Sequence, residues 1–405
     1  MQQKTLIVIG GGAAGFFCAV NAARLHPDLH VIILEKTSKL LSKVKVSGGG
    51  RCNVTHACFD IKEMSQRYPR GEHWVRKAFY QFFTTDTIQW FEERDVKLKA
   101  EEDGRMFPVT DSSQTIIDCL LREANKYSVD IRMNTEVKSI RKEVNGKFII
   151  QTAKENLSAD AVCVACGGYP KSEMFQWLVN TGHTIETPVP SLFTFNLPKH
   201  PITELMGVSV ENVKIKIQGT KLEQQGPLLI THWGLSGPAV LKLSAWGARQ
   251  LALCNWQFAV SINWLPEFSE QKLAEAFQQL RFSLAGQKMN TKNPFQLPKR
   301  FWEFMLNYSD INTETRWADL PVKMQNKLIK NLCVCEFVVQ GKTTFKEEFV
   351  TAGGIQLSEV DVNTMMSKKV DGLYFAGEIL DVDGVTGGFN FQNAWTTGFV
   401  AAKNV

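Results

Sequence analysis

The stretch Thr5-Leu-Ile-Val-Ile-Gly10-Gly-Gly-Ala-Ala-Gly15 decides the fold, because an apolar strand runs directly into a glycine turn and then a helix. Gly10 allows the tight turn, Gly12 lets the backbone approach a pyrophosphate, and Gly15 lets the helix lie close to the strand. Glu35 ends a second apolar strand, where a carboxylate can accept hydrogen bonds from ribose hydroxyls. A glycine hexad alone also suits an ordinary loop, but strand, helix and acid together predict a dinucleotide site at the helix N-terminus.

The uncharged segment from Thr5 to Ala23 has a second interpretation, as a secretory signal or a membrane anchor. Three consecutive glycines interrupt its apolar core, and no other stretch approaches the roughly 18 to 20 apolar residues of a spanning helix. We therefore expect a cytoplasmic, unprocessed protein without a membrane segment. Nine cysteines in 405 residues favour reduced thiols over a disulfide framework, and the net charge of +5 implies no partner by itself.

Residues 1–187 are expected to form the first part of an α/β nucleotide-binding domain. Helical periodicity predicts one aromatic-rich helix over Glu72–Glu93 and another over Ser112–Tyr127. Asp111 and Gln114 have the spacing of the start of the second helix.

A β-meander is expected next, with strands over Asp130–Glu136, Val137–Val144 and Lys147–Thr152. The second turn, Asn145-Gly146, is a strong hairpin signal. A buried strand over 159–168 then returns to the first sheet.

The cysteine pairs predict no redox or metal site. Cys163 and Cys166 spell C-x-x-C, but residues three apart on a strand point to opposite faces, so buried thiols are favoured over a redox disulfide. Cys333 and Cys335 would share a strand face at too great a distance for a bridge. No histidine cluster with zinc spacing accompanies any cysteine, and no metal is expected.

Residues 188–350 are expected to form an inserted substrate or cap domain. Its β part, about 188–264 and 333–350, is predicted to be barrel-like, and about 265–332 to be helical. The stretch 281–300 has five Lys or Arg and no acid, which could hold a nucleic-acid backbone, although a solvated helical face is favoured. His232, in a turn rich in glycine and serine, could exchange a proton near neutral pH or be a satisfied structural histidine.

Residues 351–405 return to the nucleotide-binding domain as its second part. Gly377-Glu378 ends a strand and could bring a backbone N–H to a phosphate and a carboxylate to a polyol. The stretch Gly384–Ala394 leads into a final helix whose N-terminus could stabilise electron density on a reduced flavin. Earlier in the chain, the loop Ser47–Asn53 could wrap a second phosphate or a planar ring, with a flexible surface loop as the alternative.

Together these stretches resemble the two-dinucleotide-binding-domain flavoproteins, and more closely the BaiN/RdsA-like (YhiN-type) bacterial flavoproteins. The resemblance implies bound FAD, an insert that covers the flavin, and hydride transfer at the flavin N5. Two departures are His56, where the family usually has asparagine after Thr55, and Cys166, where threonine is usual. The matching stretches are the first glycine turn with Glu35, 47–53, 104–108, 231–238, 351–354 and 377–392.

The residue patterns and the resemblance together assign a set of residues to FAD. This set is Gly10, Gly12, Ala13, Ala14, Gly15, Glu35, Lys36, Lys43, Ser47, Gly48, Gly49, Gly50, Arg51, Cys52, Asn53, Val137, Cys166, Gly167, Gly168, Gly377, Glu378, Gly387, Gly388, Phe389, Asn390 and Gln392.

The resemblance implies an FAD-dependent oxidoreductase, and the favoured reaction is hydride delivery to an activated C=C. Uridine in large-subunit ribosomal RNA is slightly preferred as substrate, and NAD(P)H is the expected electron donor. Three alternatives stay open: a reductase of steroid-like conjugated ketones or acids, a flavin amine oxidase, and a non-catalytic RNA-binding factor that contains FAD. Cys52, His232 and Arg105 are the candidates for the catalytic proton donor.

Overall fold

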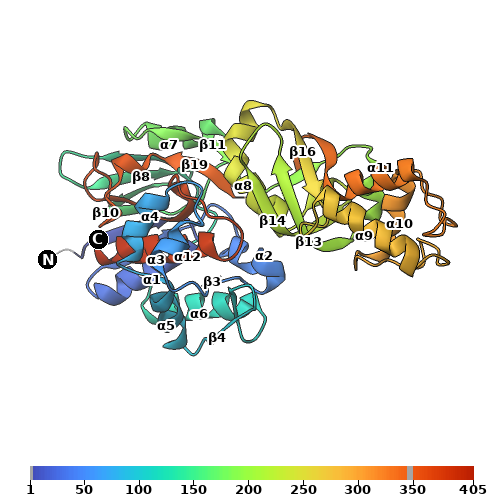
Figure 1. The fold of residues 1–405 in the computed structure, drawn as a ribbon. Coiled ribbons are helices and arrows are strands. Elements are labelled where there is room, and N and C mark those ends of the chain that lie inside the picture. Colours follow the sequence, from blue (N-terminus) through green and yellow to red (C-terminus); the bar gives the residue numbers. More distant parts are fainter. Residues whose placement is uncertain (1–2, 344–349) are drawn as a thin grey trace. The chain divides into compact units, whose positions relative to one another are not determined.

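The computed structural model describes residues 3–343 and 350–405, which form two compact units (Figure 1). One unit is Met1–Ser191 with Phe345–Val405, and the other is Leu192–Thr344. β11 (Ile185–Pro190) pairs antiparallel with β19 (Thr351–Ile355), so both strands lie in the first unit. The stretch 344–349, at the end of the expected insert, lies outside the described residues.

A five-stranded parallel sheet forms the centre of the first unit, with β1 in the middle. Residues Leu6–Ile9 of β1 are buried, which is typical of a parallel strand covered on both faces. The strands, in their order across the sheet, are β20 (Leu373–Phe375), β10 (Ala161–Val164), β1 (Thr5–Ile9), β2 (His30–Leu34) and β6 (Asp130–Arg132).

The first and last helices of this unit, α1 (Ala13–Leu25) and α12 (Phe389–Lys403), pack against each other beside the sheet (Figure 1). A Cβ on Gly398 would lie 2.7 Å from the backbone oxygen of Ala14, so glycine permits this close approach. Segments from opposite ends of the sequence therefore build one nucleotide-binding domain.

The expected helix over Glu72–Glu93 is two helices, α4 (Glu72–Phe79) and α5 (Thr84–Glu92). The Asp86 carboxylate accepts a hydrogen bond from the Phe83 N–H (2.6 Å) and starts the second helix. Aromatic side chains from both helices are buried in the core, among them Phe79, Trp90 and Phe91.

The next helix, α6 (Ser113–Lys126), is capped by Ser112 and not by Asp111 as the spacing predicted. The Ser112 Oγ accepts from the Gln114 N–H (3.3 Å), whereas the Asp111 carboxylate pairs with Lys99 (2.5 Å).

The predicted meander is wrong in its first strand. β6 pairs in parallel with β2 and belongs to the central sheet. The meander consists of β7 (Val137–Lys142), β8 (Phe148–Thr152) and β9 (Asn156–Ala159), with the turn at Gly146 between the first two. Local alternation identifies a strand but not the sheet that it joins.

The remaining elements of the first unit are short. A three-stranded sheet has the order β3, β5, β4. The elements are α2 (Ser42–Gly50), β3 (Thr55–His56), α3 (Ile61–Ser65), β4 (Leu98–Ala100), β5 (Arg105–Pro108), α7 (Gln176–Val179) and the 3₁₀ turns Ser172–Phe175, Leu357–Glu359 and Gly377–Ile379.

The inserted unit is built on a seven-stranded sheet that closes on itself. Its edge strands, β17 and β18, are consecutive in the chain and separated only by Gly341, so one segment pairs with β16 at one edge and with β12 at the other. In sheet order the strands are β17 (Cys335–Gln340), β16 (Gln257–Asn263), β13 (Ser209–Ile217), β14 (Glu223–Thr231), β15 (Gly234–Ser236), β12 (Thr194–Asn196) and β18 (Lys342–Thr343).

Among residues 192–343, four α-helices complete the inserted unit and its apolar core. α8 packs against β14, and α9 and α10 both pack against α11. The helices are α8 (Pro238–Leu253), α9 (Glu270–Ser283), α10 (Lys299–Tyr308) and α11 (Val322–Cys333).

The basic stretch 281–300 is not a helical face, because most of it lies between α9 and α10. The Arg281 guanidinium donates to the Ala318 carbonyl (3.0 Å), and that of Arg300 donates to the Glu204 carbonyl (3.0 Å). These two cations therefore stabilise neighbouring turns.

The expected strand face shared by Cys333 and Cys335 is also wrong. Cys333 ends α11 and Cys335 begins β17, and both are buried free thiols. Cys163 and Cys166 are free thiols as well.

Candidate nucleotide-binding site

The turn between β1 and α1 needs glycine at two positions for internal reasons. Gly10 has φ +116°, and an added Cβ would lie 2.5 Å from the Ala165 backbone oxygen. A Cβ on Gly15 would lie 1.9 Å from the Gly10 backbone oxygen. These glycines let the strand, the helix and the neighbouring β10 end meet.

Gly12 is different, because an added Cβ would meet nothing within 4 Å. It is the N-cap of α1, in extended conformation and without a side-chain cap, and Ala13 and Ala14 begin the helix. The first N–H groups of α1 therefore have no side-chain acceptor at the cap, and the open space beside Gly12 suits an anionic group.

The Glu35 carboxylate lies next to this turn. Its Oε2 accepts from the Gly11 N–H (2.9 Å), and its Oε1 accepts from the N–H and the hydroxyl of Thr37 (2.8 Å each). These contacts hold the acid at the end of β2, at the position predicted for a ribose. Lys36 is exposed, with its ammonium 5.6 Å from the ring centroid of Tyr169.

The Ser47–Gly50 segment breaks the α2 helix. Gly48, Gly49 and Gly50 all have positive φ, and a Cβ on Gly49 or Gly50 would meet nothing within 4 Å. A run of left-handed glycines exposes backbone to a phosphate or a flat ring, as the sequence suggested. Arg51 lies over the Phe107 ring at 4.0 Å and pairs with Glu101 (2.6 Å), which fixes the end of this loop.

Lys43 and Glu378 form an ion pair (2.5 Å) between segments far apart in the sequence. The other oxygen of the carboxylate accepts from the Thr351 N–H (2.9 Å). Gly168 lies against the same side chain, since its added Cβ would lie 3.2 Å from the Glu378 Oε1. Gly167 is adjacent, so four predicted residues from three segments come together here.

The turn before α12 joins the Ser47–Asn53 loop. Gly388 is the N-cap, with φ +93° and no side-chain cap of its own. With its amide oriented to satisfy both neighbours, Asn53 accepts from the Gly388 N–H (2.9 Å) and donates to the Thr55 carbonyl (3.0 Å). The two loops that were predicted to hold the flavin are therefore in direct contact.

His56, at the end of β3, packs against this turn, although it was not among the predicted site residues. Its Nδ1 is 3.0 Å from the Gly387 carbonyl, and its ring stacks on Phe389 with the centroids 4.7 Å apart. The sequence signal that could have identified it was the departure from asparagine at this position.

Two of the side chains that were predicted to contact FAD form hydrogen bonds with other groups of the protein. Gln392 is completely buried, and its amide oxygen accepts from the hydroxyls of Thr55 (2.6 Å) and Thr87 (3.0 Å). The Asn390 amide both donates to and accepts from the Gly384 backbone (2.9 Å each), which closes the loop before α12. These two side chains therefore stabilise the loop and the helix of the site through contacts within the protein.

The predicted cysteines are shielded thiols, and Val137 begins β7. Burial raises the pKa of the Cys52 thiol to about 12 and that of Cys166 to about 11. Both are therefore protonated at neutral pH, and Cys52, with no exposed surface, is a weak acid for catalysis.

The other two catalytic candidates belong to different units. Arg105 pairs with Glu101 (3.0 Å) and Asp103 (2.7 Å) on the β4–β5 hairpin. His232 belongs to the inserted unit, where it is exposed on the turn between β14 and β15 beside the Trp233 ring, 4.4 Å between centroids.

A buried ion pair that the sequence did not reveal holds the segment before α12 in place. The Arg70 guanidinium donates to both carboxylate oxygens of Asp383, through Nε (2.6 Å) and through Nη2. Ser191 donates to Asp383 (2.7 Å) and accepts from Arg70 (3.1 Å). This cluster anchors the segment between Gly377 and Gly388 to the end of β11.

These features fit a bound FAD molecule. The uncapped N-terminus of α1 and the oriented Glu35 carboxylate suit its pyrophosphate and ribose. An added Cβ at Gly12, Gly49 or Gly50 would meet nothing within 4 Å, so the backbone is open at these positions. When bound, FAD supplies two-electron redox chemistry. Among residues 3–343 and 350–405, no helix is long and apolar enough to cross a membrane, and no group of three or more His, Cys, Asp and Glu is placed to hold a metal.

Comparisons with known proteins agree with this fit. The model of the HI0933-like protein Rossmann domain matches residues 4–404. A ribosomal RNA dihydrouridine synthase from Escherichia coli is 31% identical over 100% of this chain and 98% of its own length. A 3-dehydro-bile acid delta(4,6)-reductase from Clostridium scindens is 28% identical over 98% of this chain and 97% of its own length.

Solved structures give the same fold. A 3-ketosteroid-delta4-(5alpha)-dehydrogenase from Rhodococcus jostii has a TM-score of 0.51, with 12% identity over 99% of this chain and 98% of that one. At this identity the likeness concerns the fold. With its open glycine turns, its oriented Glu35 and the family match over nearly its whole length, the chain belongs to the HI0933-like family of Rossmann-fold flavoproteins that bind FAD.

Proposed function

We propose that this FAD-dependent oxidoreductase is a reductase of an activated C=C, and that its substrate is uridine in large-subunit ribosomal RNA. The observation that carries this preference is the charge distribution. The inserted unit Leu192–Thr344 has 17 Lys and Arg against 11 Asp and Glu, a formal charge of +6. The rest of the chain has 29 against 30, a charge of −1.

A cationic unit of this kind suits a polyphosphate substrate, because Lys and Arg that neutralise phosphates supply most of the affinity for nucleic acid. Lys292, Lys323 and Lys330 are exposed, and none of them has an ion-pair partner among the described residues. Trp233 is 45% exposed beside His232 and offers a surface on which an unpaired base could stack. The relative named as a ribosomal RNA dihydrouridine synthase adds support.

A second candidate is a reductase of steroid-like conjugated ketones or acids. It is favoured by the full-length similarity to the bile acid reductase. A steroid-like substrate carries at most a single carboxylate and has less use for the cationic inserted unit than a polyphosphate does, so we place this candidate second.

Dihydrouridine in ribosomal RNA is expected to disappear in a strain that lacks this protein. Mass spectrometry of large-subunit ribosomal RNA measures it. The wild-type gene should restore the modification, and a Gly12→Asp variant that cannot hold FAD should not. Unchanged dihydrouridine in the deletion strain would show that the substrate is wrong. Restoration by Gly12→Asp would show instead that the protein acts as a binding factor without redox chemistry.

We also propose NAD(P)H as the electron donor. NADPH or NADH is expected to bleach the visible absorption of the bound flavin rapidly under anaerobic conditions, followed by slow recovery in air. Stopped-flow absorbance measures both steps. Slow bleaching by both nucleotides, together with fast peroxide release on addition of a small amine, would favour an amine oxidase and contradict a reductase.

A further inference from the structure

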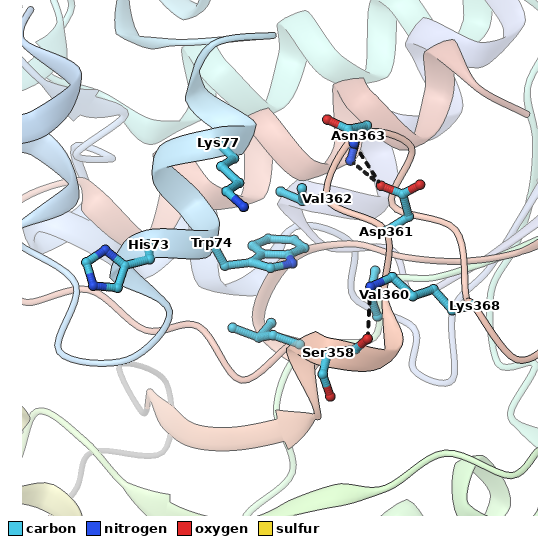
Figure 2. A pocket seen from close by; sticks show the side chains of 10 residues that line it. His73, Trp74, Lys77, Ser358, Val360, Asp361, Val362, Asn363 and Lys368 are labelled. Carbon is cyan, nitrogen blue, oxygen red and sulfur yellow. Dashed lines mark hydrogen bonds between the residues drawn. The ribbon is translucent and has the colours of Figure 1, made fainter.

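The first unit contains a cavity of about 420 Å³ between α4 and the segment from Leu357 to Lys368 (Figure 2). None of the residues assigned to FAD lines it. Its volume is within the roughly 300–1,000 Å³ of small-molecule sites. The cavity therefore offers room for a second ligand that the nucleotide-binding site does not explain.

One wall of the cavity is the indole of Trp74, which extends from α4 toward Val360 and Val362 (Figure 2). With Leu357 these side chains make an apolar, flat-sided space. The indole Nε1 is buried and has no hydrogen-bond partner among the described residues. Because Nε1 has no accessible surface, Trp74 can contact a ligand in the cavity only through its ring.

The charges at the cavity favour an anion. Lys77 follows Trp74 by one helical turn, is exposed, and has neither an ion pair nor a side-chain hydrogen bond among the described residues. On the opposite side Lys368 donates to the Ser358 carbonyl (3.0 Å), which leaves its positive charge unneutralised.

The one carboxylate that lines the cavity, that of Asp361, accepts from the backbone N–H (2.8 Å) and the side-chain amide (3.1 Å) of Asn363. Two lysines against one acid leave a positive balance. Figure 2 shows that the Lys77 side chain extends from α4 on the same side as the Trp74 ring, with both at the cavity.

We propose that this cavity binds a nucleotide, with the base on the Trp74 ring and the phosphate on Lys77. The apolar walls and the indole suit a planar aromatic ring, and an ammonium suits a phosphate as a point charge. The occupant is a free nucleotide or the adenosine phosphate half of a nicotinamide nucleotide. The site does not depend on which substrate the enzyme reduces.

The test is calorimetric titration of the FAD-loaded protein, so that the FAD site is already filled. AMP is expected to bind, and adenosine, which lacks the phosphate, at least tenfold more weakly. Lys77→Gln should weaken AMP binding by about tenfold and leave adenosine binding unchanged. Lys97→Gln, which changes an exposed lysine elsewhere in the same unit, is the matched control and should bind AMP like the wild type.

Absence of AMP binding, or equal effects of Lys77→Gln and Lys97→Gln, would overturn the proposal. Trp74→Leu should weaken AMP and adenosine alike, and a normal FAD spectrum would show that this variant is folded. The rate at which NADH bleaches the flavin distinguishes a free nucleotide from the adenosine half of a nicotinamide nucleotide as the occupant. If Lys77→Gln slows this bleaching, the cavity holds the donor's adenosine half; if only AMP binding falls, a free nucleotide is the occupant.

Discussion

Replacement of Gly12 by aspartate is expected to abolish FAD binding and to leave the apoprotein at least as stable as the wild type. A Cβ at this position meets nothing within 4 Å, and the backbone is already extended, as an N-cap requires. Aspartate is among the best N-cap residues, worth about 1 kcal/mol over a poor one. Its carboxylate would occupy the space that we predict for the pyrophosphate and would repel this group.

The matched control is Gly15→Ala, which adds a single methyl group three residues further on. That Cβ would lie 1.9 Å from the Gly10 backbone oxygen, so α1 would have to move away from the strand. We expect a loss of about 3 kcal/mol or more in the free energy of unfolding, at the upper end of overpacking effects. Urea unfolding of the apoproteins and FAD titration separate the two variants. Retention of wild-type FAD affinity by Gly12→Asp would place the phosphates elsewhere.

Arg70→Met is expected to cost about 3–5 kcal/mol of unfolding free energy, although Arg70 lies outside every glycine motif. The change removes the cation that holds both oxygens of Asp383, which has no exposed surface. The double variant Arg70→Met with Asp383→Leu should recover most of the loss, because no buried charge remains. Urea unfolding measures all three proteins, and equal stability of the single and double variants would contradict this account.

The loss should also depend on pH. Burial raises the pKa of Asp383, and the Arg70 guanidinium opposes this shift. Without Arg70 the pKa rises further, so the folded protein keeps this carboxyl protonated to a higher pH than the unfolded chain does. Stability is then retained at low pH and lost as the pH rises through the folded pKa. The destabilisation by Arg70→Met is expected to be smaller at pH 5 than at pH 8.

The features that the sequence predicted correctly are elements of local structure, and the residues assigned to FAD remain a prediction. Gly10, Gly12, Gly15 and Glu35 lie within one strand–helix–strand unit, where spacing determines position. The β-hairpin turn at Asn145-Gly146 was predicted for the same reason.

What the sequence could not reveal depends on packing between distant segments. Arg70 and Asp383 meet only because α4 packs near the loop before α12, and neither has a distinctive local pattern. The strand at Asp130 has the same alternation whether it joins the meander or the central sheet. From the sequence, the basic residues at 281–300 have no evident partners. In the structure, Arg281 and Arg300 donate hydrogen bonds to carbonyl groups of other turns.

The packing of α12 on α1 has a consequence for how the protein is made. The helix α1 leaves the ribosome well before its partner α12, which is translated only after the whole inserted unit. Until then, the face of α1 that packs on α12 lacks its partner, and the residues before α12 that we predict to contact FAD have not been made. We therefore expect FAD to be captured only once the inserted unit and α12 have been synthesised.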